Sequence, residues 1–342
     1  MISEAPPFWW QKADWRAWGL SPVSALYGVV ARQRMKRAKR EKIDAPVLCV
    51  GNLTVGGTGK TPVAMAIARQ AMRMRLKPGF LSRGHGGAVY HPHLVDLHHD
   101  VAKFVGDEPM LLAQVAPTVV TPDRAAGARH LIEHGCTFII MDDGFQSARV
   151  FFDYALLVVD AERGIGNGHM LPGGPMRARL VDQMPYADAV LKMGEGDAAD
   201  EVVRYAARAG RAVYQAARRT LKPARLRGRR FLAFTGIGNP EKFYATAEAA
   251  GATLVARRSF GDHHHFSPDD VRDLTELAAA GGAELITTAK DAARFRNGPA
   301  EMRAFADRLE VLEIEVVFEV AVTPGAIIEE TLASWHRRKL ER

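Results

Sequence analysis

The chain has 342 residues, of which 47% are apolar and 25% charged, with 31 glycines and 18 prolines. This length suits two domains, and the composition excludes a disordered chain, a collagen, a coiled coil and a multi-span membrane protein. The 2 cysteines, Cys49 and Cys136, lie within apolar runs, which excludes a disulfide scaffold and indicates a reducing compartment. The net charge of +7 suggests an anionic partner.

Residues 1–44 differ in kind from the rest of the chain. Four of the 5 tryptophans lie in the first eighteen residues, and a mostly apolar stretch over 17–31 is too short and too broken to span a bilayer. Seven Lys or Arg residues follow between 32 and 42. Aromatic and aliphatic surface beside basic charge is typical of a helix in the headgroup layer of an anionic bilayer, and an ordinary amphipathic helix is the alternative. No nucleic-acid-binding module accompanies the basic run, so the sequence predicts no nucleic-acid partner.

A glycine-rich loop follows a predicted buried strand over 46–50 and precedes a predicted helix over 63–74. This is the context of a Walker A loop, in which glycines turn backbone N–H groups toward phosphate oxygens at a helix N-terminus. Lys60 is predicted to reach the β- and γ-phosphates of a nucleotide, and Thr61 to hold Mg²⁺. The loop departs from the usual pattern at Thr54, where glycine is expected. The predicted nucleotide-binding residues are Thr54, Val55, Gly56, Gly57, Thr58, Gly59, Lys60 and Thr61.

Two adjacent carboxylates, Asp142 and Asp143, follow an apolar run over 137–141 that predicts a strand buried on both faces. In a P-loop fold, a carboxylate at the carboxyl end of a strand next to the first one organises Mg²⁺. Neighbouring side chains of an extended segment point in different directions, so we expect one acid at the metal and the other nearby.

Strands and helices alternate from residue 45 onward, with further strands predicted over 79–82, 154–160 and 187–192. This alternation predicts an α/β fold with a doubly wound, mostly parallel sheet, P-loop NTPase-like, whose ligands lie at the carboxyl ends of the strands. A connection over 218–230 holds seven Lys or Arg residues and marks a boundary. The predicted organisation is a membrane-associating segment over 1–44, a P-loop core over 45–225 and a smaller α/β domain over 226–342, with a half-exposed strand over 312–320.

Charged residues recur in the loops on the ligand side of this predicted sheet. Arg83 follows a strand, Asp107 and Glu108 open a helix, and Arg177 lies in a Gly/Pro-rich loop. Each of these alone is typical of a turn with satisfied charges, but together they favour an anionic acceptor. Farther along the chain, His263 follows Asp262 in a loop before a helix that Ser267 is predicted to cap. A histidine beside a carboxylate suits a general base, and a solvated His-rich loop is the alternative.

Assembled, these motifs resemble the tetraacyldisaccharide 4'-kinases, a family of inner-membrane-associated kinases of lipid A synthesis. The resemblance covers nearly the whole chain. It rests on segments 20–24, 51–62, 82–84, 106–109, 123–124, 142–146, 171–177, 234–240, 262–263 and 290–291. The Thr54 departure is similar to the pattern of this family.

The resemblance implies that ATP phosphorylates the 4'-hydroxyl of a tetraacylated glucosamine disaccharide 1-phosphate, giving lipid IVA, at the cytoplasmic face of the bacterial inner membrane. It implies that Asp107 is the general base and that His263 assists it, with His264 as the alternative histidine. It also implies that Asp142 and Asp143 are the residues that interact with Mg²⁺. It implies no obligate protein partner. The residues that it suggests for contacts with the acceptor are Arg83, Asp123, Arg124, Gln146 and Arg177.

A switch-type P-loop NTPase of the partitioning or metallocentre-assembly kind is the alternative function. Such a protein hydrolyses nucleotide to change partner binding and phosphorylates no sugar. The base-reading Lys-x-Asp element of GTPases is not reproduced, because Lys290 and Asp291 are adjacent. The additional Asp- and His-bearing loops also favour the kinase. Turnover of ATP without an acceptor would distinguish the switch protein from the kinase.

Overall fold

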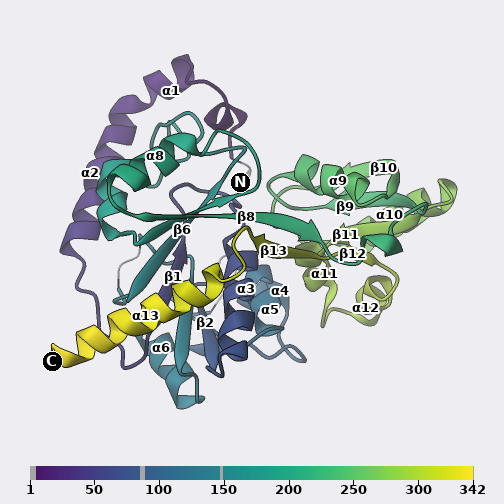
Figure 1. Cartoon of the computed structure of the whole chain (residues 1–342). Coiled ribbons are helices and arrows are strands. Elements are labelled where there is room, and N and C mark those ends of the chain that lie inside the picture. Colours follow the sequence, from purple (N-terminus) through teal and green to yellow (C-terminus); the bar gives the residue numbers. More distant parts are fainter. Residues whose placement is uncertain (1–4, 85–88, 147–148, 342) are drawn as a thin grey trace.

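The computed structural model describes residues 5–84, 89–146 and 149–341, which form two β-sheets (Figure 1). The main sheet has nine strands in the order β13-β8-β7-β6-β1-β5-β2-β4-β3. Its edge strands β3 and β13 run antiparallel to their neighbours, and the other pairs are parallel. The strands are β1 (Val47–Gly51), β2 (Pro78–Ser82), β3 (His93–Leu94), β4 (Thr118–Val120), β5 (Phe138–Asp142), β6 (Tyr154–Asp160), β7 (Ala189–Met193), β8 (Ala212–Thr220) and β13 (Ile314–Phe318).

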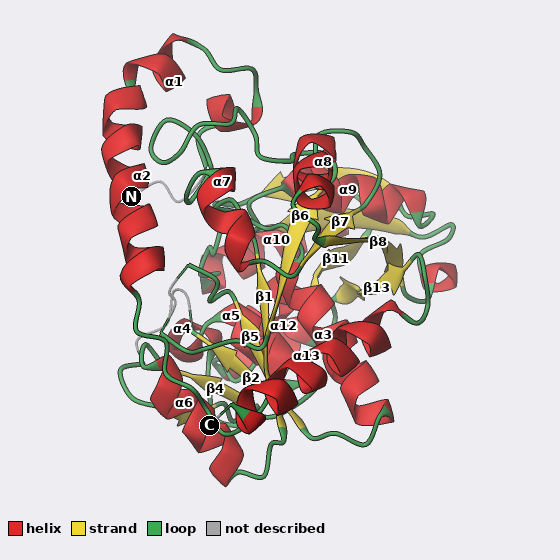
Figure 2. Cartoon of the chain, turned by 60° about the vertical axis from the view of Figure 1, so that its left-hand side comes forward, coloured by secondary structure: helices red, strands yellow, loops and turns green. Residues whose placement is uncertain are grey.

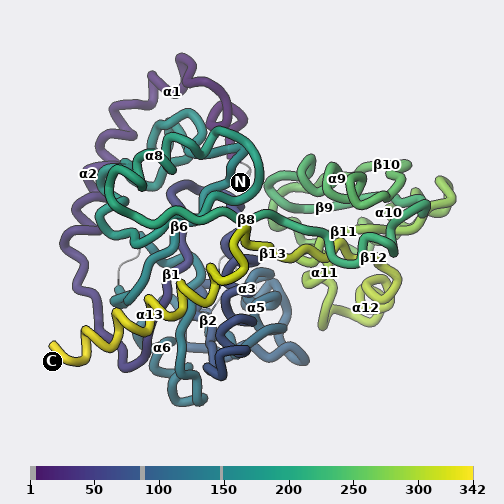
Figure 3. The backbone as a smooth tube through the Cα atoms, viewed as in Figure 1, coloured from purple at the N-terminus to yellow at the C-terminus, as the bar shows by residue number. Residues whose placement is uncertain are grey.

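Helices cover both faces of the main sheet, which confirms the predicted doubly wound α/β architecture. Successive residues of β1 alternate between two cores: Leu48 and Val50 pack toward α3 (Lys60–Arg73) and α13 (Thr323–Leu340), while Val47 and Cys49 pack toward the opposite face. The helices α6 (Arg124–Glu133) and α8 (Asp200–Arg208) contribute to that second core. Figure 3 shows α13, in yellow, crossing the strands of the main sheet.

The smaller sheet is entirely parallel, in the order β10-β9-β11-β12. The helix α9 covers one face of this sheet, and α10 and α12 pack on the other. Ser267 and Asp270 form a capping box at the start of α10, as the sequence predicts. The elements are β9 (Arg230–Thr235), α9 (Pro240–Ala249), β10 (Thr253–Ser259), α10 (Pro268–Ala280), β11 (Glu284–Thr288), α11 (Ala289–Phe295), α12 (Ala300–Ala306) and β12 (Glu310–Leu312).

The prediction of one strand over 312–320 is wrong, because the chain passes between the two sheets within it. Strand β12 ends at Leu312 in the smaller sheet, and β13 begins at Ile314 in the main sheet. Both strands are partly exposed, so an alternating pattern suits either of them. Residues 226–342 therefore contribute to both sheets.

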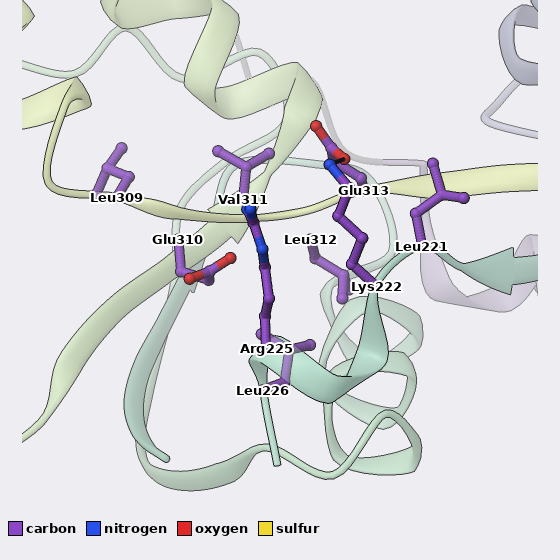
Figure 4. Close-up of a pocket in the computed structure, with 9 residues that line it drawn as sticks. All are labelled: Leu221, Lys222, Arg225, Leu226, Leu309, Glu310, Val311, Leu312 and Glu313. Carbon is purple, nitrogen blue, oxygen red and sulfur yellow. Dashed lines mark ion pairs between the residues drawn. The ribbon is translucent and has the colours of Figure 1, made fainter.

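The two passages of the chain between the sheets lie side by side. The amide of Leu221 donates to the carbonyl of Glu313 at 2.8 Å, and Lys222 pairs with Glu313 at 3.8 Å. A cavity of about 270 Å³ lies at this crossing, next to the short helix η3 (Pro223–Arg225) (Figure 4). None of the predicted site residues lines this cavity.

The N-terminal segment forms η1 (Pro7–Trp10), α1 (Trp15–Gly19) and α2 (Ser21–Arg37), which lie along one edge of the molecule (Figure 2). The inner side of α2 packs on the loop over 164–177, since the Ser24 hydroxyl donates to the Met170 carbonyl at 2.9 Å. No helix within the described residues is both long enough and apolar enough to cross a bilayer. The remaining short helices are α4 (Ala102–Val105), α5 (Asp107–Ala113), α7 (Leu180–Gln183) and η2 (Met184–Tyr186).

Candidate active site

The predicted phosphate-binding loop follows β1 and leads directly into α3. Gly56 and Gly59 have φ values of +110° and +92°, which side-chain-bearing residues rarely adopt, so the loop requires glycine there. The N-terminus of α3 has no side-chain cap, and the buried hydroxyl of Thr58 has no hydrogen-bond partner among the described residues. Unpaired polar groups at a helix N-terminus fit the binding of a phosphate.

The loop over 164–177 clamps the start of the phosphate-binding loop. The Val55 amide donates to the Pro175 carbonyl at 2.8 Å, and the Arg177 amide donates to the Leu53 carbonyl at 3.0 Å. Thr54 lies between these bonds with 1% of its surface exposed. A packed side chain therefore occupies the position where the usual Walker pattern has glycine.

Asp142, the last residue of β5, combines a hydrogen bond to the loop with an unpaired oxygen. Its Oδ2 accepts from the Thr61 hydroxyl at 3.0 Å, whereas its buried Oδ1 has no partner in the described part of the chain. Burial, reinforced by the negative charge of Glu108, raises the pKa of Asp142 to about 7.

The pair of Thr61 and Asp142 fits a divalent cation. Mg²⁺ takes oxygen ligands, commonly one or two protein carboxylates together with substrate phosphates and water. An orphaned carboxylate oxygen beside a hydroxyl at the phosphate loop has this chemistry. Within residues 5–84, 89–146 and 149–341, no three or more His, Cys, Asp or Glu side chains gather as an all-protein metal site.

Asp143 turns away from Asp142 and forms ion pairs. Its backbone has a φ of +53°, and its carboxylate accepts two hydrogen bonds from Arg177, both at 3.0 Å. Lys60 Nζ lies 3.8 Å from Asp143 Oδ2. Burial alone would raise the pKa of Asp143, but Lys60 and Arg177 lower it below the usual range. The Arg177 guanidinium also donates to Gln146 Oε1 at 3.3 Å.

A second group of charges lies where α5 of the main sheet meets α11 of the smaller sheet. The buried Asp107 Oδ2 is 3.2 Å from His263 Nδ1 and 2.6 Å from Arg294. Burial opposes ionisation of Asp107, yet the hydrogen bond from His263 and the charges of Lys290 and Arg294 hold its pKa well below the usual range. The structure thus brings Asp107 and His263 together from different sheets.

Glu108 connects this group with the phosphate loop. Its carboxylate lies 3.1 Å from Lys290 Nζ, and the charges of Lys290 and then Lys60 lower its pKa. The negative charge of Glu108 in turn contributes to the raised pKa of Asp142. The sequence prediction placed Glu108 on the ligand side without a role, although its position next to Asp107 in the first turn of α5 was a usable signal.

The other predicted site residues lie in varied surroundings. The Asp123 carboxylate accepts two backbone N–H bonds at 3.1 Å and caps α6. Arg124 donates to the backbone carbonyl of Asp143 at 3.0 Å, and burial lowers its pKa to about 10. Arg83 is exposed at the end of β2, and part of the loop that follows it, residues 85–88, lies outside the described residues. His264 faces α10, where its Nε2 is 3.1 Å from Asp270.

Several residues at the site carry no local sequence signal. Arg294 lies next to Asp107 although 187 residues separate them, and Arg218 of β8 donates to the carbonyl of Thr58 at 3.4 Å. Gln183 Oε1 accepts a hydrogen bond from Gln146 at 2.9 Å. These contacts depend on the packing of the two sheets, which a single sequence does not reveal.

Known proteins resemble this chain along nearly its whole length. Residues 16–332 match the family described as "Tetraacyldisaccharide-1-P 4'-kinase". The chain is 61% identical over 341 residues to the tetraacyldisaccharide 4'-kinase of Mesorhizobium japonicum, and the match covers 99% of each chain. It is 58% identical over 340 residues to the tetraacyldisaccharide 4'-kinase of a Chelativorans species, again covering 99% of each chain.

The fold is similar to that of the LpxK protein of Aquifex aeolicus, which was crystallised in complex with ATP, with a TM-score of 0.72. That match has 24% sequence identity and covers 92% of this chain and 99% of the other. The sequence-based resemblance and the predicted P-loop-type fold are therefore confirmed. On the family match and the identity to full-length relatives, this chain belongs to the tetraacyldisaccharide-1-P 4'-kinase family of enzymes.

Proposed function

We propose that this enzyme transfers the γ-phosphoryl group of ATP to the 4'-hydroxyl of a tetraacylated glucosamine disaccharide 1-phosphate, giving lipid IVA. The observation that most supports this proposal is the continuity of the charged groups at the carboxyl ends of the strands. Asp107 Oδ2 lies 3.2 Å from His263 Nδ1, and helix α5, which begins at Asp107, contacts helix α3, which begins at Lys60 of the phosphate loop. A base and a phosphate site in one continuous cluster suit transfer to an acceptor hydroxyl.

In the proposed step, the 4'-oxygen forms a bond to the γ-phosphorus while the bond from that phosphorus to the bridging oxygen of ADP breaks. The hydroxyl proton passes to Asp107. Arg294 and His263 engage Oδ2 of this carboxylate, and Oδ1 accepts from the Glu108 amide at 2.9 Å. We therefore assign the proton to Oδ1, where fewer donors compete with the incoming hydrogen.

The phosphate loop stabilises the charge of the transferred group. The backbone N–H groups from Gly56 to Thr61 and the ammonium of Lys60 bind the phosphate oxygens in this proposal. Thr61 and Asp142 would hold Mg²⁺, which would supply positive charge to stabilise the transferred group. Asp143 orients Lys60 and Arg177 through its ion pairs with both side chains.

Substrate contacts belong to the same proposal. Arg124 and Arg177 both contact Asp143, and Gln146 contacts Arg177. These three side chains therefore belong to one hydrogen-bonded polar cluster near the phosphate loop. Arg83 is exposed and directly follows β2, which pairs with β5, the strand that ends at Asp142. Two or more arginines beside a nucleotide loop suit an acceptor that carries its own phosphate. Asp123 acts on the acceptor only through the position of α6, whose end it caps.

We further propose that α1 and α2 rest on the anionic cytoplasmic face of the inner membrane. Their outer side exposes large apolar residues, among them Trp15 at 80%, Trp18 at 63% and Leu26 at 67%. The exposed cations Arg34, Lys36 and Arg37 lie in the last turn of α2. Apolar surface next to Lys and Arg is the pattern of a helix at an anionic interface.

The proposed membrane-facing segment also touches the phosphate loop. The Trp9 indole donates to the Pro172 carbonyl at 3.0 Å, within the loop that clamps Val55. A side-chain carbon added to Gly56 would lie 3.7 Å from the ring of Trp10. An acceptor anchored in the bilayer by its acyl chains would therefore meet the phosphate loop at the membrane surface.

Incubation with γ-labelled ATP, Mg²⁺ and the tetraacylated acceptor in mixed micelles tests this proposal. We expect label in the organic phase, at the 4'-position, with ATP consumption that depends on the acceptor. Asp107→Asn should abolish the transfer while ATP still binds. ATP hydrolysis that ignores the acceptor would favour the switch-type NTPase, and full transfer by Asp107→Asn would refute the assignment of the base.

A further inference from the structure

We infer that Arg294 is a positioning residue that keeps Asp107, next to the main sheet, and His263, next to the smaller sheet, in their relative positions. This inference rests on the proposed role of Asp107 as the base. The guanidinium group has 4% of its side-chain surface exposed and lies on α11 of the smaller sheet. It bonds directly to Asp107, and it shares the carbonyl of Gly236 with the backbone amide of His263.

The contact with Asp107 uses one edge of the guanidinium fork. Arg294 Nε and Nη2 both donate to Asp107 Oδ2, at 3.2 Å and 2.6 Å. Two bonds from one planar group converge on this one oxygen and fix its position. The Glu108 amide, which donates to Oδ1 at 2.9 Å, holds the other oxygen of the carboxylate. Lys290 lies 3.9 Å from Oδ2 and contributes charge without this geometry.

The remaining nitrogen of Arg294 acts on His263. Its Nη1 donates to the carbonyl of Gly236 at 2.9 Å, and the same carbonyl accepts from the backbone amide of His263 at 3.1 Å. A side-chain carbon added to Gly236 would come within 2.9 Å of Nη1, so the close approach requires glycine. His263 adopts a φ of +58°, and the shared carbonyl holds it in that uncommon conformation.

Asp291 anchors Arg294 within the smaller sheet. Its fully buried carboxylate accepts from Arg294 Nη1 at 2.7 Å, and also from the hydroxyls of Thr235 at 2.6 Å and Thr288 at 2.7 Å. With so many donors, Asp291 has little freedom to move. Arg294 therefore transmits the position of the smaller sheet to a carboxylate of the main sheet. The Arg294→Lys substitution removes the planar guanidinium that reaches Asp107, Gly236 and Asp291 together.

Steady-state kinetics of Arg294→Gln and Arg294→Lys test this inference, with Arg272→Gln on the exposed side of α10 as the matched control. We expect kcat to fall roughly a hundredfold in Arg294→Gln, because small misplacements of a reacting group have effects of that size. The KM for ATP should change less than about threefold, since the hydrogen bonds of Arg294 to described residues go to Asp107, Gly236, His264 and Asp291, outside the phosphate loop. Guanidinium ion added at millimolar concentration should restore part of the rate of an Arg294→Ala variant.

The pH profile separates positioning from a purely structural role. Asp107 faces the cations Arg294 and Lys290, the imidazole of His263 and the carboxylate of Glu108. Loss of one cation raises the pH at which Asp107 loses its charge, so the acid limb of kcat/KM should move to higher pH in Arg294→Gln. Arg272→Gln should keep the profile of the unmodified enzyme.

The kinetics of Arg294→Gln and Arg294→Lys decide whether Arg294 positions the base. If Arg294→Gln folds and keeps the unmodified kcat and acid limb, the inference is overturned. If Arg294→Gln does not fold, Arg294→Lys decides: it keeps the buried charge but not the fork, so a normal kcat in that variant also overturns the inference. The base assignment fails separately, when Asp107→Asn retains the transfer. An inactive Asp107→Asn with a normal Arg294→Gln refutes only the positioning role.

Discussion

Arg338, near the end of α13, offers a direct measure of how the C-terminal helix is held on the main sheet. Its side chain has 6% of its surface exposed, and the side chain of Asp153 is fully buried. The guanidinium donates to both Asp153 oxygens, at 2.7 Å and 3.0 Å, and to the carbonyl of Ile43 at 3.2 Å. This pair joins the chain end to the strand that precedes the phosphate loop, since Asp153 Oδ2 also accepts from the Val47 amide.

We expect Arg338→Ala to lower the free energy of unfolding by about 3–5 kcal/mol, because it leaves the Asp153 carboxylate buried without a counter-charge. In domains of roughly 150–250 residues, 1 kcal/mol corresponds to about 2–4 °C in Tm, so Tm should fall by about 6–20 °C. Lys339 is the matched control in the same turn: it pairs with Asp44 at 3.0 Å, but the two side chains are 42% and 69% exposed. Lys339→Ala should change stability by less than about 1 kcal/mol.

Urea unfolding followed by circular dichroism measures both variants. The double variant Arg338→Met with Asp153→Asn should recover part of the loss, because neither buried charge then remains. Equal effects of Arg338→Ala and Lys339→Ala would refute the reasoning from burial. So would a double variant whose destabilisation is the sum of those of the Arg338→Met and Asp153→Asn single variants, since that result would show no coupling between the partners.

Three further variants test the site and the membrane-facing helices. Lys60→Ala should lower kcat for labelled-phosphate transfer by at least about a hundredfold, because it removes the cation from the phosphate loop. Asp142, with its folded pKa of about 7, keeps a proton that the unfolded chain releases above about pH 4. Ligand-free protein should therefore lose stability as the pH rises from about 4 to about 7, and urea titrations of Asp142→Asn should show a smaller loss across that window. Trp18→Ser with Leu26→Ser should weaken sedimentation with anionic vesicles about tenfold or more, while Leu277→Ser, at an exposed position of α10, should not.

Local patterns predicted the elements that position the phosphate site. The buried run ending at Val50, the glycines of the loop and the carboxylates after β5 each have a signal within a few residues. Strand β6 (Tyr154–Asp160) has the predicted bounds because it is a nearly continuous apolar run inside the main sheet. The Ser267 cap could be predicted as well, since capping depends on residues three apart.

The contacts that assemble the site could not be predicted in the same way. Arg294 and Asp107 are 187 residues apart, and Lys290 and Glu108 are 182 apart. Nothing in either local sequence specifies its partner, because the pairing depends on where α11 settles against α5. The sequence also did not predict that the chain passes from the smaller sheet to the main sheet at Glu313. Two short half-exposed strands in different sheets produce the same alternation of apolar and polar residues as one longer strand.

This distribution of signals reflects how the chemistry is divided between the two sheets. The phosphate loop is complete within the main sheet, so a local motif can encode it. The proposed base is on the main sheet, whereas His263, Arg294 and Lys290 come from the smaller one. A second set of ion pairs crosses the same interface, where Lys242 of α9 lies 3.1 Å from Asp160 at the end of β6. If these residues have the proposed roles, separation of the two sheets would leave the phosphate loop intact but would remove His263, Arg294 and Lys290 from Asp107. The position of the smaller sheet would then be required for phosphoryl transfer but not for ATP binding.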